Sequence, residues 1–477
     1  MTKYETIIGL EVHAQLKTAS KMFCSCATSF GDEPNTNICP VCTGQPGTLP
    51  VVNESAITMA IRAGLALGCD IHKKSVFARK NYFYPDLPKG YQISQYELPL
   101  CTGGSLNIRT QEERKLISLT RIHLEEDAGK LLHDYGHADM SHVDFNRCGV
   151  PLIEIVSGPD MRSPKEAGDY LRTLRNVLVY LDICEGNLQE GNFRCDANVS
   201  IRPFGQKKFG TRTEMKNLNS FKAVERALAF ETLRQTEVLD SGGIVIQETR
   251  LWNDALQKTE TMRTKEEAHD YRYFPDPDLL PLIVNEQWID KVRSSLPELA
   301  CAKADRFVRD YGIREDEAAI LTDEKALADY FESVIAAGAR AKKAANWILA
   351  ELLRELKEEE EGIKKCPVTP SNLAKLIGLI EDGKISGKIA KEIFAEMYKN
   401  GKTAENIVKE KGLEQISDSS EIETVIDKII ADSTKQVQQY KDGKANVFGY
   451  FVGQVMKATK GQANPNIVNE LLKKKLN

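Results

Sequence analysis

The alternation of apolar and polar residues changes character near residue 295. Before this point, short runs rich in β-branched residues alternate apolar and polar positions and are separated by Gly, Pro and Asn. Examples are TIIGLEVHAQL (6–16), VPLIEIVSG (150–158) and CDANVSIRP (195–203). Period-two alternation of this kind predicts β-strands, and we expect a largely antiparallel sheet.

Three stretches of this half have helical spacing instead, at 53–67, 164–181 and 221–239. The second of them has Ser163 in the N-cap position and Pro164 at the first helical position, a common start of a helix. We therefore expect a sheet accompanied by a few helices.

From about residue 296 onward nearly every segment has helical period and strong helix formers. Thr369 and Ser386 are expected N-caps, and Gly383 and Gly401 are expected helix ends. The fold class predicted is α+β. Its expected parts are a sheet domain (1–295), a helical domain (296–404) and a small all-α tail domain (405–477).

Composition limits the kinds of function. Hydrophobic residues make up 42% and charged residues 28% of the 477 residues, which is typical of a globular enzyme. The 64 basic and 69 acidic side chains give a net charge of −5, so a nucleic-acid surface has to be a local patch. No export signal is recognised, and the best apolar stretch, 56–69, is interrupted by Arg62. We expect a cytoplasmic protein that does not enter a membrane.

The clearest local motif consists of four cysteines in two close pairs. Cys24-x-Cys26 is followed after twelve residues by Cys39-Pro-Val-Cys42. Four thiolates at this spacing favour tetrahedral zinc, and a site without a water position is structural and not catalytic. The alternative is a loop without a metal, in which the four cysteines are reduced or one pair forms a disulfide.

A second group consists of polar side chains on the expected strands. Alternation places Glu11 and His13 on one face of their strand, and Glu154 is the lone carboxylate in an apolar run. A buried carboxylate costs several kcal/mol unless it is paired or metal-bound. Oxygen ligands with one imidazole favour Mg²⁺ or Mn²⁺. Taken singly, however, a solvent-facing strand acid is common, and a hydrogen-bonded histidine at a sheet edge would explain His13. The candidate ligands are Glu11, His13, Glu125, Glu126, Glu154, Asp196 and Glu214.

Two loops combine aromatic, basic and Pro-Asp elements at 79–96 and 271–282. Rigid loops of this kind suit a phosphate or a nucleotide, with Arg79, Lys80 and Arg272 as charge partners. Tyrosines buried beneath the loops would explain the same composition. The closest approach to a phosphate loop, 378–384, lacks the required hydroxyl and follows a helix, so we interpret it as a helix end.

The last part of the chain is basic, with eight lysines against two acids from Lys435 onward. Gly449 and Gly453 lie one turn apart on an expected helix, and Lys457 and Lys460 follow them. A smooth strip flanked by lysines fits an RNA backbone, although helix–helix packing with solvated lysines explains it too.

Taken together, these motifs resemble those of the B subunits of glutamyl/aspartyl-tRNA amidotransferases (GatCAB), over about residues 4–475. The runs that carry the resemblance are IGLEVHAQL, RKNYFYPDLPKGYQISQY, RIHLEEDAGK, PLIEIVSGPDMRSPKEA, EGNFRCDANVSIRP, EMKNLNSF, DYRYFPDPDL and VGQVMKATKGQANP. The resemblance implies a cradle similar to the fold of glutamine synthetase, a helical domain, and a tail that binds tRNA.

The resemblance also implies an activity. ATP would phosphorylate the side-chain carboxyl of Glu-tRNA(Gln) or Asp-tRNA(Asn), and ammonia channelled from a partner glutaminase A subunit would then form the amide. A small C subunit would complete a heterotrimer. By position, the candidate ligands above line the Mg²⁺ pocket, Lys80, Tyr82 and Arg194 lie near the reaction, and Lys80, Arg194, Lys216 and Arg272 contact the nucleotide. Zinc varies within the family.

Two other functions remain open from the sequence. One is a zinc-containing tRNA-binding scaffold in which the acids are structural. The other is a free-standing ATP-dependent ligase of the glutamine synthetase type.

Overall fold

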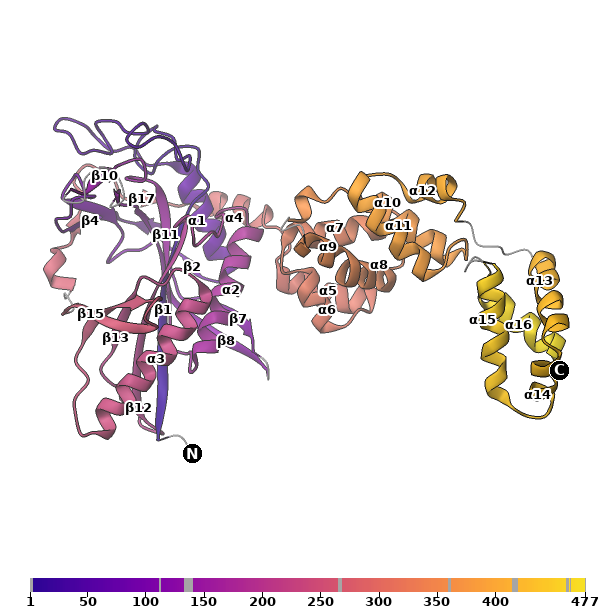
Figure 1. Cartoon of the computed structure of the whole chain (residues 1–477). Coiled ribbons are helices and arrows are strands. Elements are labelled where there is room, and N and C mark those ends of the chain that lie inside the picture. The colour runs from indigo at the N-terminus through magenta and orange to yellow at the C-terminus, as the bar shows by residue number, and fades with distance from the viewer. Residues whose placement is uncertain are drawn as a thin grey trace. The chain divides into compact units, whose positions relative to one another are not determined.

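A computed structural model describes residues 3–110, 113–132, 140–264, 268–358, 362–413, 419–459, 463 and 465–476. The chain divides into two compact units, Met1–Leu299 and Ala300–Asn477 (Figure 1). The first unit contains a large mixed sheet and the second is helical, which confirms the coarse expectation of a sheet followed by helices.

The first unit is built on a sheet of ten strands. Along its main path the order is β15-β14-β13-β12-β1-β11-β8-β6-β2, and β7 pairs with β8. Every neighbouring pair is antiparallel except β13 and β14, which run parallel. The strands are β1 (Tyr4–Gln15), β2 (Asp70–Ile71), β6 (Cys101–Thr102), β7 (Ser105–Arg109), β8 (Arg114–Glu126), β11 (Pro151–Ser157), β12 (Phe193–Pro203), β13 (Thr213–Lys216), β14 (Glu248–Asn253) and β15 (Lys258–Thr264).

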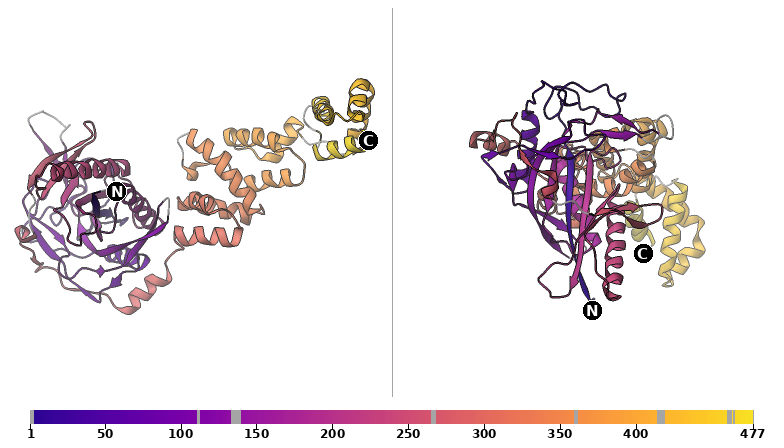
Figure 2. Two further views of the ribbon diagram at one scale, coloured as in Figure 1. Left: turned by 90° about the horizontal axis from the view of Figure 1, so that it is seen from below. Right: turned by 90° about the vertical axis from the view of Figure 1, so that its left-hand side faces the viewer.

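Helices α1 (Glu54–Ala66), α2 (Pro164–Tyr180) and α3 (Phe221–Asp240) pack against the apolar face of this sheet, as Figures 1 and 2 show. Leu10 and Val12 of β1 point into the core there, together with Ile153 and Ile155 of β11. The Ser163 side chain accepts a hydrogen bond from the Glu166 N–H and caps α2, as the sequence predicts. Because side chains alternate along a strand, the polar residues of the same strands occupy the opposite face.

Short strands join loops that are far apart in the sequence. β4 (Ala78–Asn81) pairs with both β5 (Tyr91–Ser94) and β16 (Phe274–Pro275), while β3 (Lys74–Ser75) pairs with β17 (Leu282–Ile283). The two aromatic loops at 79–96 and 271–282 therefore form one structure. A further pair consists of β9 (Lys130–Leu132) and β10 (His142–Asp144).

The second unit has two hydrophobic clusters. The first involves helices from α5 (Ala300–Tyr311) to α12 (Ala404–Lys411) and includes Ile407 and Val408, which follow the predicted boundary at residue 404. The second starts at Ile422 and involves helices α13 to α16. None of the helices in the described ranges has the length and apolar character needed to cross a bilayer.

The remaining helices are α4 (Glu286–Ser294), α5 (Ala300–Tyr311), α6 (Glu315–Leu321), α7 (Lys325–Ala336), α8 (Ala341–Trp347), the π-helical turn η2 (Ile348–Leu352), α9 (Leu353–Glu358), α10 (Pro370–Glu381), α11 (Gly387–Asn400), α12 (Ala404–Lys411), α13 (Ser419–Asp432), α14 (Thr434–Lys441), α15 (Phe448–Ala458) and α16 (Pro465–Leu476), with 3₁₀ turns η1 (Ala268–Tyr271), η3 (Ile363–Lys365) and η4 (Ala445–Val447). Thr369 and Ser386 cap α10 and α11 with their side chains, and Gly401 adopts the left-handed conformation just after α11, as predicted.

Candidate functional site

A row of polar side chains crosses four neighbouring strands on the polar face of the sheet. His13 of β1 lies opposite Arg194 of β12 on one side and Glu154 of β11 on the other, and Glu154 lies opposite His123 of β8. Residues directly opposite in antiparallel strands point to the same face. Residues that are up to 181 positions apart thereby meet in one place because of strand register.

His13 and Glu154 of this row form a compact cluster with Glu125 of β8. The His13 Nε2 atom lies 3.5 Å from Glu125 Oε1 and 3.4 Å from Glu154 Oε2. One possible ligand atom from each of His13, Glu125 and Glu154 lies within 4.8 Å of the others. This spacing allows all three atoms to contact one divalent cation, and two carboxylates with an imidazole suit Mg²⁺ or Mn²⁺.

The cluster continues toward β13. Lys216 Nζ lies 2.7 Å from Asp196 Oδ2 and 3.6 Å from Glu214 Oε1, and Asn198 donates a hydrogen bond to Glu11. Burial, reinforced by the charges of Glu154 and Glu214, raises the pKa of Glu11. The polar face therefore concentrates negative charge.

The pKa values of the histidine and carboxyl groups in the cluster reflect this negative charge. Burial alone would lower the pKa of His13, but its contacts with Glu154 and Glu125 outweigh burial and raise that pKa to about 9. Burial alone would raise the pKa of Glu154, whereas His123 and His13 hold it well below its usual range. The field that retains a proton on His13 also attracts a divalent cation, and cation binding would release that proton.

Lys80 adds a cation at the edge of the cluster. Its Nζ atom lies 4.9 Å from the centre of the Tyr271 ring and 5.8 Å from that of Tyr82. Although burial alone would lower the pKa of Lys80, Tyr273 and Glu125 raise it, so the ammonium stays charged. Arg272, by contrast, is exposed and has a φ of 45°.

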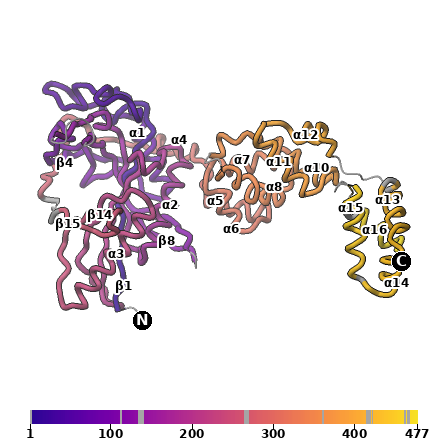
Figure 3. Tube along the Cα trace, in the orientation of Figure 1, coloured from indigo at the N-terminus to yellow at the C-terminus, as the bar shows by residue number. Residues whose placement is uncertain are grey.

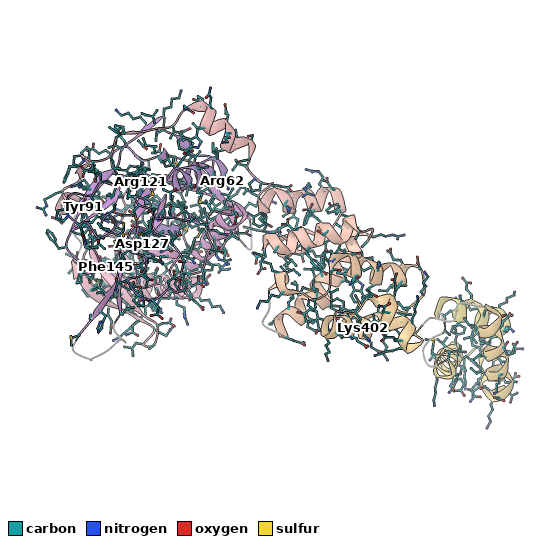
Figure 4. The ribbon with its side chains drawn as sticks, turned by 90° about the horizontal axis from the view of Figure 1, so that it is seen from above. Arg62, Tyr91, Arg121, Asp127, Phe145 and Lys402 are labelled. Atoms are coloured by element: carbon teal, nitrogen blue, oxygen red, sulfur yellow. The ribbon has the colours of Figure 1, made fainter. Side chains whose placement is uncertain are left out.

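Arg194 is held in place by Asp127, a buried acid that follows β8. An Arg194 guanidinium N–H donates to Asp127 Oδ2 at 2.8 Å, and Gln15 Nε2 donates to the same oxygen at 2.7 Å. Figure 4 labels Arg121 and Asp127, which flank the stretch of β8 that carries His123 and Glu125. Asp127 is not among the predicted metal ligands, and His123 is not singled out by the sequence, although both lie in the run that supplied Glu125.

Glu126 lies apart from the cluster. Its side chain accepts a hydrogen bond from the Ile93 N–H at 3.0 Å and pairs with Lys89. Both members of this pair are buried, with exposed side-chain fractions of 6% for Lys89 and 2% for Glu126. Of the predicted ligands, His13, Glu125 and Glu154 lie close enough together to share one ion. Glu11, Asp196 and Glu214 lie nearby on the same polar face, and Glu126 lies apart.

We expect Lys89→Met to lower the free energy of unfolding by about 3–5 kcal/mol, because it leaves the buried Glu126 charge without a partner. Denaturant unfolding of the chain measures this change. The double variant Lys89→Met with Glu126→Gln keeps the acceptor for the Ile93 N–H and removes the unpaired charge. It should regain part of the loss, and a double variant no more stable than the single one would contradict the explanation.

The four predicted zinc ligands also meet. One sulfur atom from each of Cys24, Cys26, Cys39 and Cys42 lies within 4.8 Å of the others, a cluster that could bind a metal such as zinc. All four residues are in the described part of the chain, and their thiols are free. Contact with Cys24 lowers the pKa of Cys42 to about 4, and the same contact raises the pKa of Cys24 well above its usual range. One sulfur of this pair is therefore a thiolate that holds the proton of the other, and zinc binding would release that proton.

In the tail, the expected helix is α15. Phe451 and Val455 are buried in the core of the last four helices, so the apolar side of α15 is used for packing. Gly449 and Gly453 are exposed, and a Cβ atom on either would meet nothing within 4 Å. Lys457 is exposed on the same helix, and Lys460 lies outside the described residues.

Comparison with known proteins gives matches along nearly the whole chain. Residues 6–290 match the family described as GatB/GatE catalytic domain, and residues 329–476 match the family described as GatB domain. The chain is 55% identical over 475 residues to the B subunit of the aspartyl/glutamyl-tRNA(Asn/Gln) amidotransferase of Syntrophotalea carbinolica, covering 100% of this chain and 99% of that protein. The proteins of the same name from Solidesulfovibrio magneticus (56%; 100% of both chains) and Thermodesulfovibrio yellowstonii (55%; 98% of both chains) are equally similar.

Proposed function

Because the chain belongs to the family of aspartyl/glutamyl-tRNA(Asn/Gln) amidotransferase B subunits, we propose that its polar sheet face activates the side-chain carboxyl of Glu-tRNA(Gln) or Asp-tRNA(Asn) with ATP. As a member of this family, the chain is part of a ligase complex. The observation that supports the proposed chemistry most is the cluster of His13, Glu125 and Glu154 beside Lys80.

The activation step is a phosphoryl transfer. A carboxylate oxygen of the aminoacyl group attacks the γ-phosphorus of ATP, ADP leaves, and an acyl phosphate forms. Such a transfer depends on positioning and on neutralising the phosphate charges. Mg²⁺ held by His13, Glu125 and Glu154 would neutralise phosphate oxygens, with Glu11, Asp196 and Glu214 close by. Lys80, Arg194 and Lys216 are the cations that would face the phosphates, Tyr82 would help to place Lys80, and the exposed Arg272 would contact the outer part of the nucleotide.

The second step is amide formation. Ammonia attacks the acyl carbon, the amide forms and phosphate leaves. Water has to be excluded from its path, because ammonia that becomes ammonium is no longer a nucleophile. A separate glutaminase A subunit would supply the ammonia through a channel, a small C subunit would complete a heterotrimer, and the complex would act in the cytoplasm. We also propose, from the resemblance to the family, that the sheet domain forms a cradle similar to the fold of glutamine synthetase.

Isotope transfer tests the proposal directly. The assembled complex is given Glu-tRNA(Gln) labelled with ¹⁸O in the side-chain carboxyl, ATP, Mg²⁺ and an ammonium salt in place of glutamine. Activation through an acyl phosphate moves one labelled oxygen into inorganic phosphate, which mass spectrometry detects. Amide formation with unlabelled phosphate would overturn the proposal. Amide formation from free glutamate by the chain alone would favour the free-standing ligase instead.

The tail is proposed to bind tRNA through Lys457. We expect Lys457→Ala to weaken tRNA binding severalfold and to reduce the salt dependence of binding by roughly one phosphate contact. Filter binding at several salt concentrations measures both. Lys428→Ala, an exposed lysine on α13, is the matched control. Equal affinities of the wild type and Lys457→Ala for tRNA would show that Lys457 does not take part in tRNA binding.

A larger test removes the tail domain. Since Ile407 and Val408 belong to the core of the preceding helices, the deletion is best begun after Leu413. It should weaken tRNA binding and leave the folding of the first unit unchanged.

A further inference from the structure

Two histidines contact the same pair of carboxylates. Glu154 lies between His13 and His123 in the row across the sheet, and its Oε2 atom is 3.4 Å from the Nε2 atom of each. Glu125 also contacts both rings, with Oε1 3.5 Å from His13 Nε2 and Oε2 3.7 Å from His123 Nε2. The four side chains thus form a closed ring of alternating imidazoles and carboxylates.

The two histidines differ in access to solvent. The side chain of His13 is 20% exposed, whereas that of His123 is 3% exposed. A cation that enters from the open side of the ring therefore meets His13 first. His123 lies at the closed side, and its nitrogen is not among the three ligand atoms that lie close enough together to share one ion.

Hydrogen bonding around His123 indicates which nitrogen carries the proton. Among the described residues, its buried Nδ1 atom has no hydrogen-bond partner. A proton on Nδ1 would be left without an acceptor, while a proton on Nε2 faces the oxygens of Glu125 and Glu154. With its proton on Nε2, His123 presents an N–H to the two carboxylates at 3.4 and 3.7 Å and does not offer a lone pair to a metal.

Ser94 also contacts Glu125, on the side that faces His123. The Ser94 hydroxyl donates a hydrogen bond of 3.1 Å to Glu125 Oε2, the oxygen that His123 also faces. Ser94 thereby holds Oε2 on the side of His123, whose Nε2 lies 3.7 Å away, and Oε1 is left pointing toward His13. The carboxylate is oriented before any cation arrives.

We propose that His123 is a positioning residue that, together with Ser94, orients Glu125 and Glu154 toward a divalent cation at His13. This inference rests on the proposed function, in which that cation serves phosphoryl transfer. Groups that orient metal ligands in this way typically change metal affinity or activity by about 10–100-fold when they are removed.

Mn²⁺ binding to the assembled complex tests the inference without requiring turnover. Electron paramagnetic resonance of free Mn²⁺ gives the dissociation constant for the wild type, His123→Leu and His123→Gln. We expect His123→Leu to weaken Mn²⁺ binding by about 10-fold or more. His123→Gln should restore most of the affinity, because its amide N–H₂ can donate where the imidazole Nε2–H does.

In activity assays, the Mg²⁺ concentration for half-maximal ATP cleavage should rise for His123→Leu, with little change in KM for the aminoacyl-tRNA. Wild-type Mn²⁺ affinity in His123→Leu, or equal loss in the Leu and Gln variants, would overturn the inference. If His123→Leu does not fold, Ser94→Ala replaces it and should weaken Mn²⁺ binding more modestly. An unchanged affinity in Ser94→Ala would then overturn the inference.

Glu154→Gln separates this inference from the proposed function. If it binds Mn²⁺ as tightly as the wild type, the cation site itself is absent and the proposed function fails. If Glu154→Gln loses Mn²⁺ binding and His123→Leu retains it, only the proposed positioning role of His123 is wrong.

Discussion

Replacing Glu154 by Gln is expected to lower tRNA-dependent ATP cleavage by the assembled complex by about 10²–10³-fold. The substitution keeps the volume of the side chain and removes one negative charge from the site that faces both His13 and His123. A metal ion supplies several kcal/mol of charge stabilisation to a transferring phosphoryl group, and each 1.36 kcal/mol changes the rate tenfold. Phosphate release in the presence and absence of Glu-tRNA(Gln) measures the effect.

Glu237→Gln is the matched control, because Glu237 is an exposed carboxylate on α3 of the same unit. It should retain the wild-type rate and report any general effect of an acid-to-amide change. Thermal unfolding of Glu154→Gln shows whether the fold is retained. A folded Glu154→Gln complex with nearly wild-type ATP cleavage would favour the scaffold, in which the acids are structural.

Much of the polar face could be predicted from the sequence because strands alternate strictly. Alternation placed Glu11 and His13 on one side of β1, and the register of β1 with its neighbours bears this out. The same rule separates Glu125 from Glu126, since adjacent strand residues face opposite sides. Applied to β8, alternation places Glu126 on the face opposite the cluster. It places His123, two positions before Glu125, on the same face as the cluster.

The convergence of the strands could not be predicted. Glu154 meets His13 because β11 pairs with β1 in one register, and a shift of one residue would have turned Glu154 to the apolar face. Likewise, the pairing of Arg79 with Phe274, which joins the two aromatic loops, spans 195 residues of sequence. Pairings between residues so far apart in the sequence depend on the whole fold. The local composition of a loop does not indicate which segment it pairs with.

Among the substitutions considered, one that prevents the four-cysteine cluster from binding the expected zinc should have the largest effect on stability. The cluster lies in the segment between β1 and α1, residues 16–53, which belongs to the indigo part of the tube in Figure 3. Within this fully described segment, the regular pairing is confined to an isolated bridge between Ser20 and Ala27. A structural zinc contributes roughly 10 kcal/mol or more of binding free energy, which far exceeds what such a segment gains from its own backbone hydrogen bonds.

The consequences should extend beyond the segment. Gly44 has a φ of +69° and packs so closely against Lys89 that a Cβ atom would lie 2.4 Å from Lys89 Cγ. Lys89 in turn pairs with Glu126, the neighbour of Glu125. Residues that follow Cys42 therefore support the loop that carries Lys89, and disorder in the segment would loosen one wall of the proposed active site.

We expect Cys42→Ser to reduce bound zinc from about one ion per chain to well below half. It should also speed proteolysis within residues 24–50, lower the midpoint of thermal unfolding and reduce ATP cleavage. Lys21 adds to the expected loss of stability, because its buried ammonium lies 3.6 Å from Cys42 Sγ and loses its anionic partner in the variant. Metal analysis by mass spectrometry and limited proteolysis measure the two primary effects.

Cys301→Ser is the control, since Cys301 is an exposed cysteine of α5 in the other unit. It should match the wild type in zinc content and in the rate of proteolysis. If the purified wild-type chain contains no zinc and Cys42→Ser is cleaved no faster, the four thiols are not a structural metal site. The segment would then owe its order to packing alone, through contacts such as that between Gly44 and Lys89.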